Sequence, residues 1–189
     1  MSIGTNMNPT LNEQEFIILK NFIPVERALA LAEEFESYCK ENNIGTPWEG
    51  LNASEVRQWP PFVELLNEKV GILSELTEVT LLPSFAQARV YHEGAALFHH
   101  KDRSACQFGI TVHLRGDTDW PLFFQRDQDE EPTGVLLSPG EAILYLGSRV
   151  THWRDFYVGN TYTQVFLFYV DANGPHANEA YDQLHNPTK

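Results

Sequence analysis

Three side chains in the sequence are of the types that together bind a ferrous ion. His100 and Asp102 stand two residues apart, and His152 lies in a later segment. On a strand, residues two apart leave from the same face, so His100 and Asp102 can converge on one ion, and His152 must then come from a second strand. Two imidazoles and one carboxylate hold iron on one side and leave the opposite positions free for substrate and oxygen. The set predicts an Fe(II) site that supports oxygen chemistry.

The histidine next to this set, His99, is not expected to be a ligand. Successive strand residues point to opposite faces, so His99 points away from His100 and is predicted to be a surface or packing residue. A slip of one residue in the strand register would exchange the two histidines, but Asp102 shares a face only with His100. Strand alternation therefore favours His100.

Other motifs flank the three candidate ligands in a fixed order. A Tyr-x-x-Gly motif at residues 91–94 precedes His100-x-Asp102, and a Pro-Gly-Glu turn at residues 139–141 leads into an apolar segment before His152. In order and content, roughly residues 16–174 resemble the catalytic domain of the Fe(II)/2-oxoglutarate-dependent oxygenases, particularly the prolyl 4-hydroxylase-like branch. The resemblance implies an Fe(II) cofactor, 2-oxoglutarate as cosubstrate and O2. It also implies a hydroxylase (dioxygenase) that acts on a peptidyl residue, with proline as one option, or on a free amino acid or small molecule.

The sequence departs from this family where the cosubstrate should bind. Family members usually place an arginine or lysine about ten residues after the distal histidine, but residues 160–164 contain no basic residue. Tyr91 corresponds to a tyrosine that contacts the cosubstrate in such relatives. Arg89 shares the strand face of Tyr91, and Arg154 shares that of His152, so either guanidinium could hold a carboxylate through two hydrogen bonds. For each arginine the alternative is an ion pair with a local carboxylate, such as Asp155 or Glu93.

Two further residues are candidates for the cosubstrate pocket. His113 matches a family position that often lends a polar contact to the same carboxylate, and the alternative is a core histidine satisfied by a backbone carbonyl. Gln164 and Tyr162 occupy the inward face of the last predicted strand, where the usual basic residue would stand. They can supply neutral hydrogen bonds only.

Composition restricts the class of protein further. A chain of 189 residues with 42% apolar residues predicts a single domain over residues 1–189. The formal net charge of −13 disfavours nucleic acid as a partner, because polyanion binding requires clustered Lys and Arg. The first residues lack a signal peptide, no apolar run is long enough for a membrane span, and Cys39 and Cys106 are too few for a disulfide framework. A cytoplasmic protein is expected, and its oligomeric state is left open.

The pattern of the chain predicts a mainly β protein with N-terminal helices, a double-stranded β-helix of the jelly-roll, cupin-like type. Residues 14–80 are expected to hold a strand at 16–22 and helices at 24–42 and 61–75, packed against the outside of one sheet, with a loop at 45–53 between them. Residues 81–172 should form the β-helix, and residues 173–189 a polar tail that is loosely packed or disordered. Eight strands are predicted in the β-helix, at 84–92, 97–101, 105–114, 119–125, 134–137, 141–146, 150–156 and 161–171.

Two other functions compete with the oxygenase. One is a jelly-roll binding module with a degenerate or structural metal site, which the missing basic residue supports. The other is a cupin-like metalloenzyme that does not use 2-oxoglutarate. Such sites usually recruit additional histidines, and only His99 and His113 are nearby.

Overall fold

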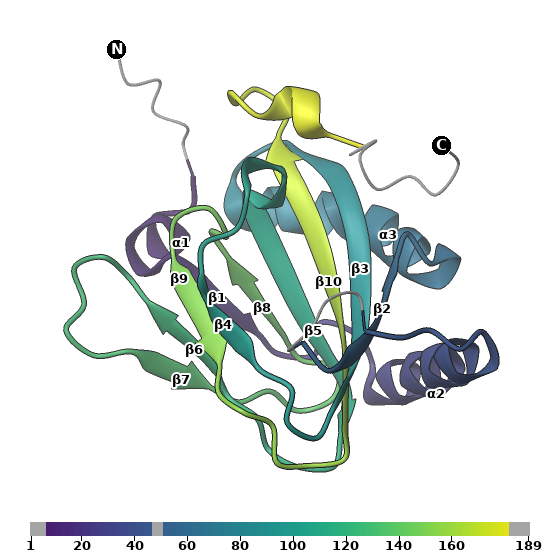
Figure 1. The fold of residues 1–189 in the computed structure, drawn as a ribbon. Helices are drawn as coiled ribbons and strands as arrows, with labels where there is room; N and C mark the ends of the chain where they lie inside the picture. The colour runs from purple at the N-terminus through teal and green to yellow at the C-terminus, as the bar shows by residue number, and fades with distance from the viewer. Residues whose placement is uncertain (1–6, 47–50, 182–189) are drawn as a thin grey trace.

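Two antiparallel β-sheets face each other in the computed structural model, which describes residues 7–46 and 51–181 (Figure 1). The six-stranded sheet has the order β1-β8-β5-β10-β3-β2, and the four-stranded sheet has the order β4-β9-β6-β7. All of the strand pairs are antiparallel. The predicted architecture of two facing sheets is confirmed.

The elements follow one another in the order that the sequence predicts, with boundaries shifted by a few residues. The strands are β1 Phe16–Leu19, β2 Ala53–Arg57, β3 Leu81–His92, β4 Leu97–His100, β5 Phe108–Gly116, β6 Leu122–Gln125, β7 Thr133–Val135, β8 Ala142–Tyr145, β9 Thr151–Arg154 and β10 Thr161–Asp171. The helices are α1 Pro9–Gln14, α2 Val25–Glu41 and α3 Pro60–Thr77, with short 3-10 turns η1 Ser104–Cys106 and η2 Ala177–Glu179.

Helices α2 and α3 cover the outer face of the six-stranded sheet, as predicted (Figure 1). The buried residues of α2 recur at steps of three and four, which places them on one side of the helix. They are Ala28, Ala32, Phe35 and Cys39. These side chains pack with apolar residues of β3, β5 and β10 in the largest hydrophobic core. In the described part of the chain, no helix has the length and apolarity to cross a membrane.

Two elements were not predicted. Helix α1 has six residues and buries only Leu11, so it shows no hydrophobic period, although Asn8 caps it by accepting from the Leu11 N–H at 3.2 Å. Strand β2 pairs with β3 along its length but carries Glu55 and Arg57, so it lacks an apolar alternation. A strand whose side chains contact charged residues rather than a hydrophobic core shows no apolar alternation, so the sequence does not reveal it.

Residues 173–181 of the predicted tail form hydrogen bonds with β3. The Ser84 hydroxyl donates to the Glu179 carbonyl at 3.2 Å, and the Tyr181 N–H donates to the Pro83 carbonyl at 2.8 Å. Residues 182–189, and residues 47–50 of the predicted loop at 45–53, lie outside the described residues. The described fold therefore continues beyond β10 to residue 181.

Strand β10 divides its side chains between the two sides of the six-stranded sheet. Val165 and Leu167 point toward the helices and belong to the largest core. Gln164 and Phe166 point into the space between the two sheets, as the sequence predicts. Arg89 of β3 lies directly beside Gln164 in the register. Polar and aromatic residues therefore meet in the interior of the β-helix.

Candidate metal centre and cosubstrate pocket

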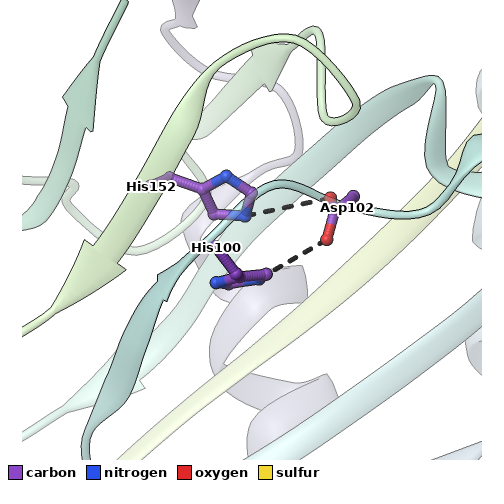
Figure 2. Close-up of side chains that lie close together, drawn as sticks. All are labelled: His100, Asp102 and His152. Carbon is purple, nitrogen blue, oxygen red and sulfur yellow. Dashed lines mark ion pairs between the residues drawn. The ribbon is translucent and has the colours of Figure 1, made fainter.

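The three predicted ligands lie together between β4 and β9. His100 and His152 are directly opposite one another in the register of these strands, and Asp102 follows β4, where its N–H donates to the Gly147 carbonyl at 2.8 Å. One ligand atom from each side chain lies within 4.8 Å of the others. Figure 2 shows both imidazoles facing the carboxylate, with Nε2 of His100 at 3.5 Å from Oδ1 and Nε2 of His152 at 3.8 Å from Oδ2.

Backbone carbonyls orient both imidazoles. Nδ1 of His100 lies 2.8 Å from the Phe98 carbonyl, and Nδ1 of His152 lies 3.1 Å from the Val150 carbonyl. A carbonyl only accepts, so each Nδ1 must carry the hydrogen, and in a neutral ring Nε2 then offers a lone pair. Metal-binding histidines are commonly fixed in this way by a partner on the other nitrogen. Both Nε2 atoms are therefore presented to the point where a metal ion would lie.

The protonation of the two histidines differs because their burial differs. Burial lowers the pKa of His152 to about 4, so this ring is neutral at physiological pH. Burial also acts to lower the pKa of His100, but the neighbouring Asp102 outweighs it and raises that pKa above its usual value. In the absence of a metal, a proton at His100 can balance Asp102, and a divalent cation would replace that proton.

One carboxylate oxygen of this cluster has no hydrogen-bond donor among the described residues. It is the buried Oδ2 of Asp102. A buried oxygen of a carboxylate without a partner is costly, and bound divalent cations commonly meet this need. The donor set, the imidazole orientation and this unpartnered oxygen all fit a divalent metal ion. Neither His99, which stacks on Trp153 at 3.9 Å, nor His113 joins the cluster.

Sequence reasoning missed two residues that shape this centre. Gly147 allows the close approach of Asp102, because a Cβ at position 147 would lie 2.5 Å from Oδ2 and would collide with the Cys106 carbonyl. The Tyr145 ring lies 4.9 Å from the His152 ring, and burial, with Asp102 nearby, raises the pKa of its hydroxyl well above the usual value. Gly147 follows the predicted apolar strand, which was the only signal in the sequence.

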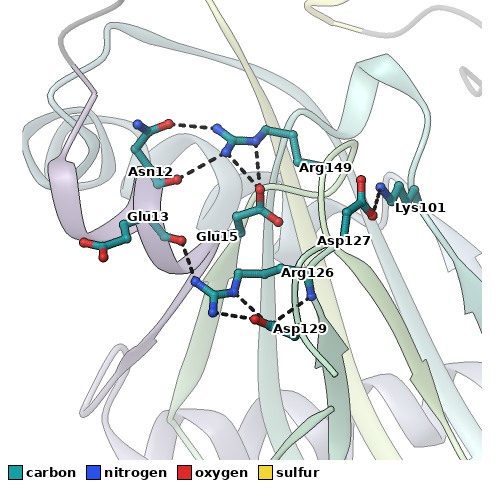
Figure 3. A network of polar contacts seen from close by, with 8 residues as sticks. All are labelled: Asn12, Glu13, Glu15, Lys101, Arg126, Asp127, Asp129 and Arg149. Carbon is teal, nitrogen blue, oxygen red and sulfur yellow. Dashed lines mark hydrogen bonds and ion pairs between the residues drawn. The ribbon is translucent and has the colours of Figure 1, made fainter. Parts of the chain in front are cut away.

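Ion pairs outside the centre fix the segments that carry the ligands (Figure 3). Arg149, three residues before His152, binds the Glu15 carboxylate at 2.9 Å and the Asn12 side chain at 2.8 Å. Lys101, between the two ligands of the first segment, binds Asp127 at 2.7 Å. The second pair is largely exposed and contributes little to stability. The Arg149 contacts tie the turn before β9 to the N-terminal helix α1.

A cavity of about 450 Å3 contains the candidate metal centre and is also lined by Arg89. Arg89 is buried, donates through Nε to the Glu55 carboxylate at 2.7 Å and donates to the Tyr91 hydroxyl at 3.0 Å. The alternative expected for Arg89, an ion pair with a local carboxylate, is therefore present. The partner is Glu55 and not Glu93, because the unpredicted strand β2 brings Glu55 alongside β3.

Arg154 is more deeply buried, with 2% of the residue exposed, and lies outside the lining of the cavity. It donates to the Trp120 carbonyl, to Oε1 of Gln164 at 3.0 Å and to the Tyr162 hydroxyl at 3.5 Å. The rings of Trp120 and Tyr162 flank its guanidinium at 4.7 and 4.9 Å. Among the described residues no carboxylate pairs with Arg154, so the expected ion pair with Asp155 is absent.

His113 and Gln164 surround this arginine. Gln164 accepts from Arg154 and donates to the Thr111 hydroxyl at 3.1 Å, so it holds the guanidinium in place. His113 stacks on Tyr162 at 4.4 Å, and its buried Nδ1 has no hydrogen-bond partner in the residues that the structure describes. Burial, assisted by the positive charge of Arg154, lowers the pKa of His113 to about 4. The surroundings of Arg154 are therefore neutral as well as buried.

No protein-family model and no curated protein matches the sequence, but solved structures match the fold over most of the chain. A prolyl-4-hydroxylase from Pseudomonas putida has a TM-score of 0.64 at 16% identity, over 86% of this chain and 95% of that one. SnoK, a non-heme alpha-ketoglutarate-dependent carbocyclase from nogalamycin biosynthesis, has a TM-score of 0.71 at 12% identity, over 88% and 85%. HygX from Streptomyces hygroscopicus, with nickel and 2-oxoglutarate bound, has a TM-score of 0.67 at 10% identity, over 86% and 85%.

The chain therefore has the double-stranded β-helix fold of the Fe(II)/2-oxoglutarate oxygenases, a group that includes prolyl 4-hydroxylases. The likeness that the sequence motifs indicate is confirmed at the level of the fold. Identities this low do not transfer ligands or substrates. The function of this chain depends on its own residues.

Proposed function

We propose that the chain is an Fe(II)- and 2-oxoglutarate-dependent oxygenase, a hydroxylase of a small molecule or a peptidyl residue. The observation that carries the proposal is the convergence of His100, Asp102 and His152. Both Nε2 lone pairs face a carboxylate whose Oδ2 has no hydrogen-bond donor among the described residues. Two histidines and one carboxylate are the ligand set of the non-haem iron oxygenases, and they leave coordination positions open.

In this proposal the three side chains hold the metal, and the rest of the chain orients and shields it. Iron with 2-oxoglutarate and O2 supplies the oxidising power when bound. The Phe98 and Val150 carbonyls keep both imidazoles in the ligating tautomer. Tyr145 stays protonated, because burial raises its pKa, and it packs beside His152 as an uncharged wall. These residues preorganise the centre.

We place the distal carboxylate of 2-oxoglutarate at Arg154. A buried cation without an anionic partner is costly, so a dianionic cosubstrate would supply the missing charge. The guanidinium contacts Tyr162 and Gln164, the β10 positions where relatives usually carry a basic residue, so an arginine of β9 reaches the same region. Arg89 is the second candidate, since it lines the cavity, but Glu55 already balances its charge. A small side-chain movement must open the path from the cavity to Arg154.

The proposal is tested by anaerobic titration of the full chain with Fe(II) and 2-oxoglutarate. The oxygenase predicts the weak visible charge-transfer band of the iron chelate, followed by succinate formation when oxygen is admitted. A cupin-like metalloenzyme would bind Fe(II) without this band, and a binding module with a degenerate site would show neither. Absence of the band at saturating Fe(II) and 2-oxoglutarate would refute the proposed function.

The control variant is Asp102→Ala. It removes the only negative ligand and leaves both histidines, so we expect it to lose the band and iron-dependent turnover. The variant should stay folded, since Asp102 lies outside β4, which ends at His100, and its Oδ2 has no hydrogen-bond partner among the described residues. Turnover equal to that of the unmodified chain would show that the metal binds elsewhere.

A further inference from the structure

Two arginines share one carboxylate in the wall of the cavity. Arg57 donates through Nε to Oε1 of Glu55 at 3.2 Å, while Oε2 of Glu55 accepts from Arg89 at 2.7 Å and from Gln87 at 2.8 Å. Arg57, Arg89 and Gln87 all line the cavity, and the Glu55 side chain is only 6% exposed. Two guanidinium groups therefore share one carboxylate on this side of the cavity, in a chain whose formal net charge is −13.

Arg57 is the member of this group that a ligand can reach. Its side chain is 29% exposed, whereas that of Arg89 is 9% exposed. Only Nε of Arg57 has a hydrogen-bond acceptor among the described residues, so its two terminal nitrogens remain available. Paired N–H groups of a guanidinium match the two oxygens of a carboxylate. Glu55 thus fixes the position of Arg57 through one nitrogen and leaves the other two for an anion.

Aromatic rings adjoin this guanidinium. The Arg57 guanidinium carbon lies 5.8 Å from the centre of the Phe85 ring, and that of Arg103 lies 5.0 Å from it. Phe85 packs on Phe168 at 4.7 Å, and Phe168 stacks with Phe166 at 6.2 Å. All three phenylalanines line the cavity that contains the candidate metal centre. An apolar surface therefore connects the cationic rim with the ligands.

We infer that the substrate is a small molecule with a carboxylate on an apolar or aromatic body. Its carboxylate binds Arg57, and its body lies on Phe85, Phe166 and Phe168, which directs the far end toward the metal. This inference rests on the proposed oxygenase function. The cavity volume of about 450 Å3 is in the range of small-molecule sites. A peptidyl residue such as proline would bring neutral amides to a rim that is built for an anion.

The test compares two ligands of nearly equal shape, 4-phenylbutyrate and 4-phenylbutanamide. Calorimetric titration uses the full chain with Zn(II), which does not react with oxygen, and saturating 2-oxoglutarate, so that Arg154 is occupied. We expect the carboxylate to bind roughly tenfold more tightly than the amide, as for a charge-assisted hydrogen bond at a partly exposed site. Equal affinities, or no binding of either probe at millimolar concentration, would overturn the inference. Tighter binding of a neutral proline-containing peptide would also overturn it.

Variants of Arg57 test whether this residue causes the preference for the carboxylate over the amide. Arg57→Met should abolish most of the discrimination between the two probes. Arg57→Lys should retain part of it, because lysine keeps the positive charge but lacks the paired N–H donors of a guanidinium. Arg27→Met is the matched control, since Arg27 is a surface residue of α2 whose partner is Glu68 of α3. Unchanged discrimination in Arg57→Met would overturn the assignment. If Arg57→Met does not fold, the lysine variant and the ligand pair on the unmodified chain still decide.

The probe-binding test of the substrate class and the chelate-band test of the proposed function can fail independently. If the iron chelate band forms but the two probes bind equally, the oxygenase stands and the substrate class is wrong. If the band fails to form while the carboxylate preference depends on Arg57, the site binds carboxylates without the proposed chemistry.

Discussion

The replacement of Arg154 by methionine tests the proposal that this residue holds the distal carboxylate of 2-oxoglutarate in place of a basic residue on β10. Methionine keeps much of the side-chain length and removes the charge. Arg154 is 2% exposed and donates only to neutral acceptors, so the variant deletes a buried cation that no protein carboxylate balances in the described chain. We expect 2-oxoglutarate binding to weaken strongly while metal affinity changes much less.

The magnitude follows from the burial of the guanidinium. Removing one partner of a buried charge pair costs about 2–5 kcal/mol, which is roughly 30- to 4,000-fold in the dissociation constant. The carboxylate must displace a neutral acceptor such as Gln164 or Tyr162, so we expect the lower end, about 30- to 100-fold. The metal-free variant should change in stability by only about 1–2 kcal/mol, because the lost hydrogen bonds are offset by the removal of an unpaired buried charge.

The measurement is the anaerobic chelate band as a function of 2-oxoglutarate concentration, with urea unfolding of the metal-free proteins alongside. Arg89→Met is the comparison, since Glu55 balances Arg89, and its loss should lower stability more than it weakens 2-oxoglutarate binding. The reverse pattern, with weak binding in Arg89→Met and normal binding in Arg154→Met, would place the carboxylate at Arg89. Normal binding in both variants would refute an arginine clamp and favour the binding-module hypothesis.

Two further predictions concern the metal centre and its surroundings. Gly147→Ala places a Cβ against the Asp102 carboxylate and the Cys106 carbonyl, so we expect at least about tenfold weaker Fe(II) binding and about 1–3 kcal/mol lower stability, measured by metal titration and urea unfolding. Gly71→Ala, where a Cβ meets no atom within 4 Å, is the control, and equal behaviour of the two variants would contradict the steric argument. His113 has a folded pKa of about 4, below its ordinary 6.5, so the unfolded chain takes up its proton first and stability must fall as the pH decreases from 6.5 to 4. His113→Gln should remove up to about 3 kcal/mol of that decline in urea unfolding free energy, and a decline identical to that of the unmodified chain would show that His113 is protonated in the folded state.

The candidate ligands could be predicted from the sequence because each depends on local geometry. The two-residue period of a strand predicted that His100 and Asp102 lie on one side, although β4 ends at His100 and Asp102 follows it. The same rule predicted that Arg154 shares the face of His152 and that Arg89 shares the face of Tyr91. The hydrophobic period of α2 predicts a packing helix for the same reason. The double-stranded β-helix followed from the order of the motifs together with the short-strand pattern after residue 80.

Contacts between residues far apart in the chain could not be predicted from the sequence. Strand β2 has no apolar alternation, so neither the strand nor the Arg57–Glu55–Arg89 group could be predicted, and Glu93 was the nearer choice of partner by sequence distance. The need for a glycine at position 147 depends on how closely the turn after β8 approaches Asp102.

The sequence by itself determined which residues are candidate metal ligands, because residue type and strand period are local properties. Only the tertiary structure decided which arginine charge is paired with a carboxylate. That of Arg89 is paired with Glu55, and that of Arg154 has no carboxylate partner among the described residues. The charge state of a buried group depends on every neighbour that the fold brings within a few ångströms. Glu55 comes to Arg89 from a different strand, whereas the acceptors of Arg154 in the described part of the chain are carbonyl, amide and hydroxyl oxygens.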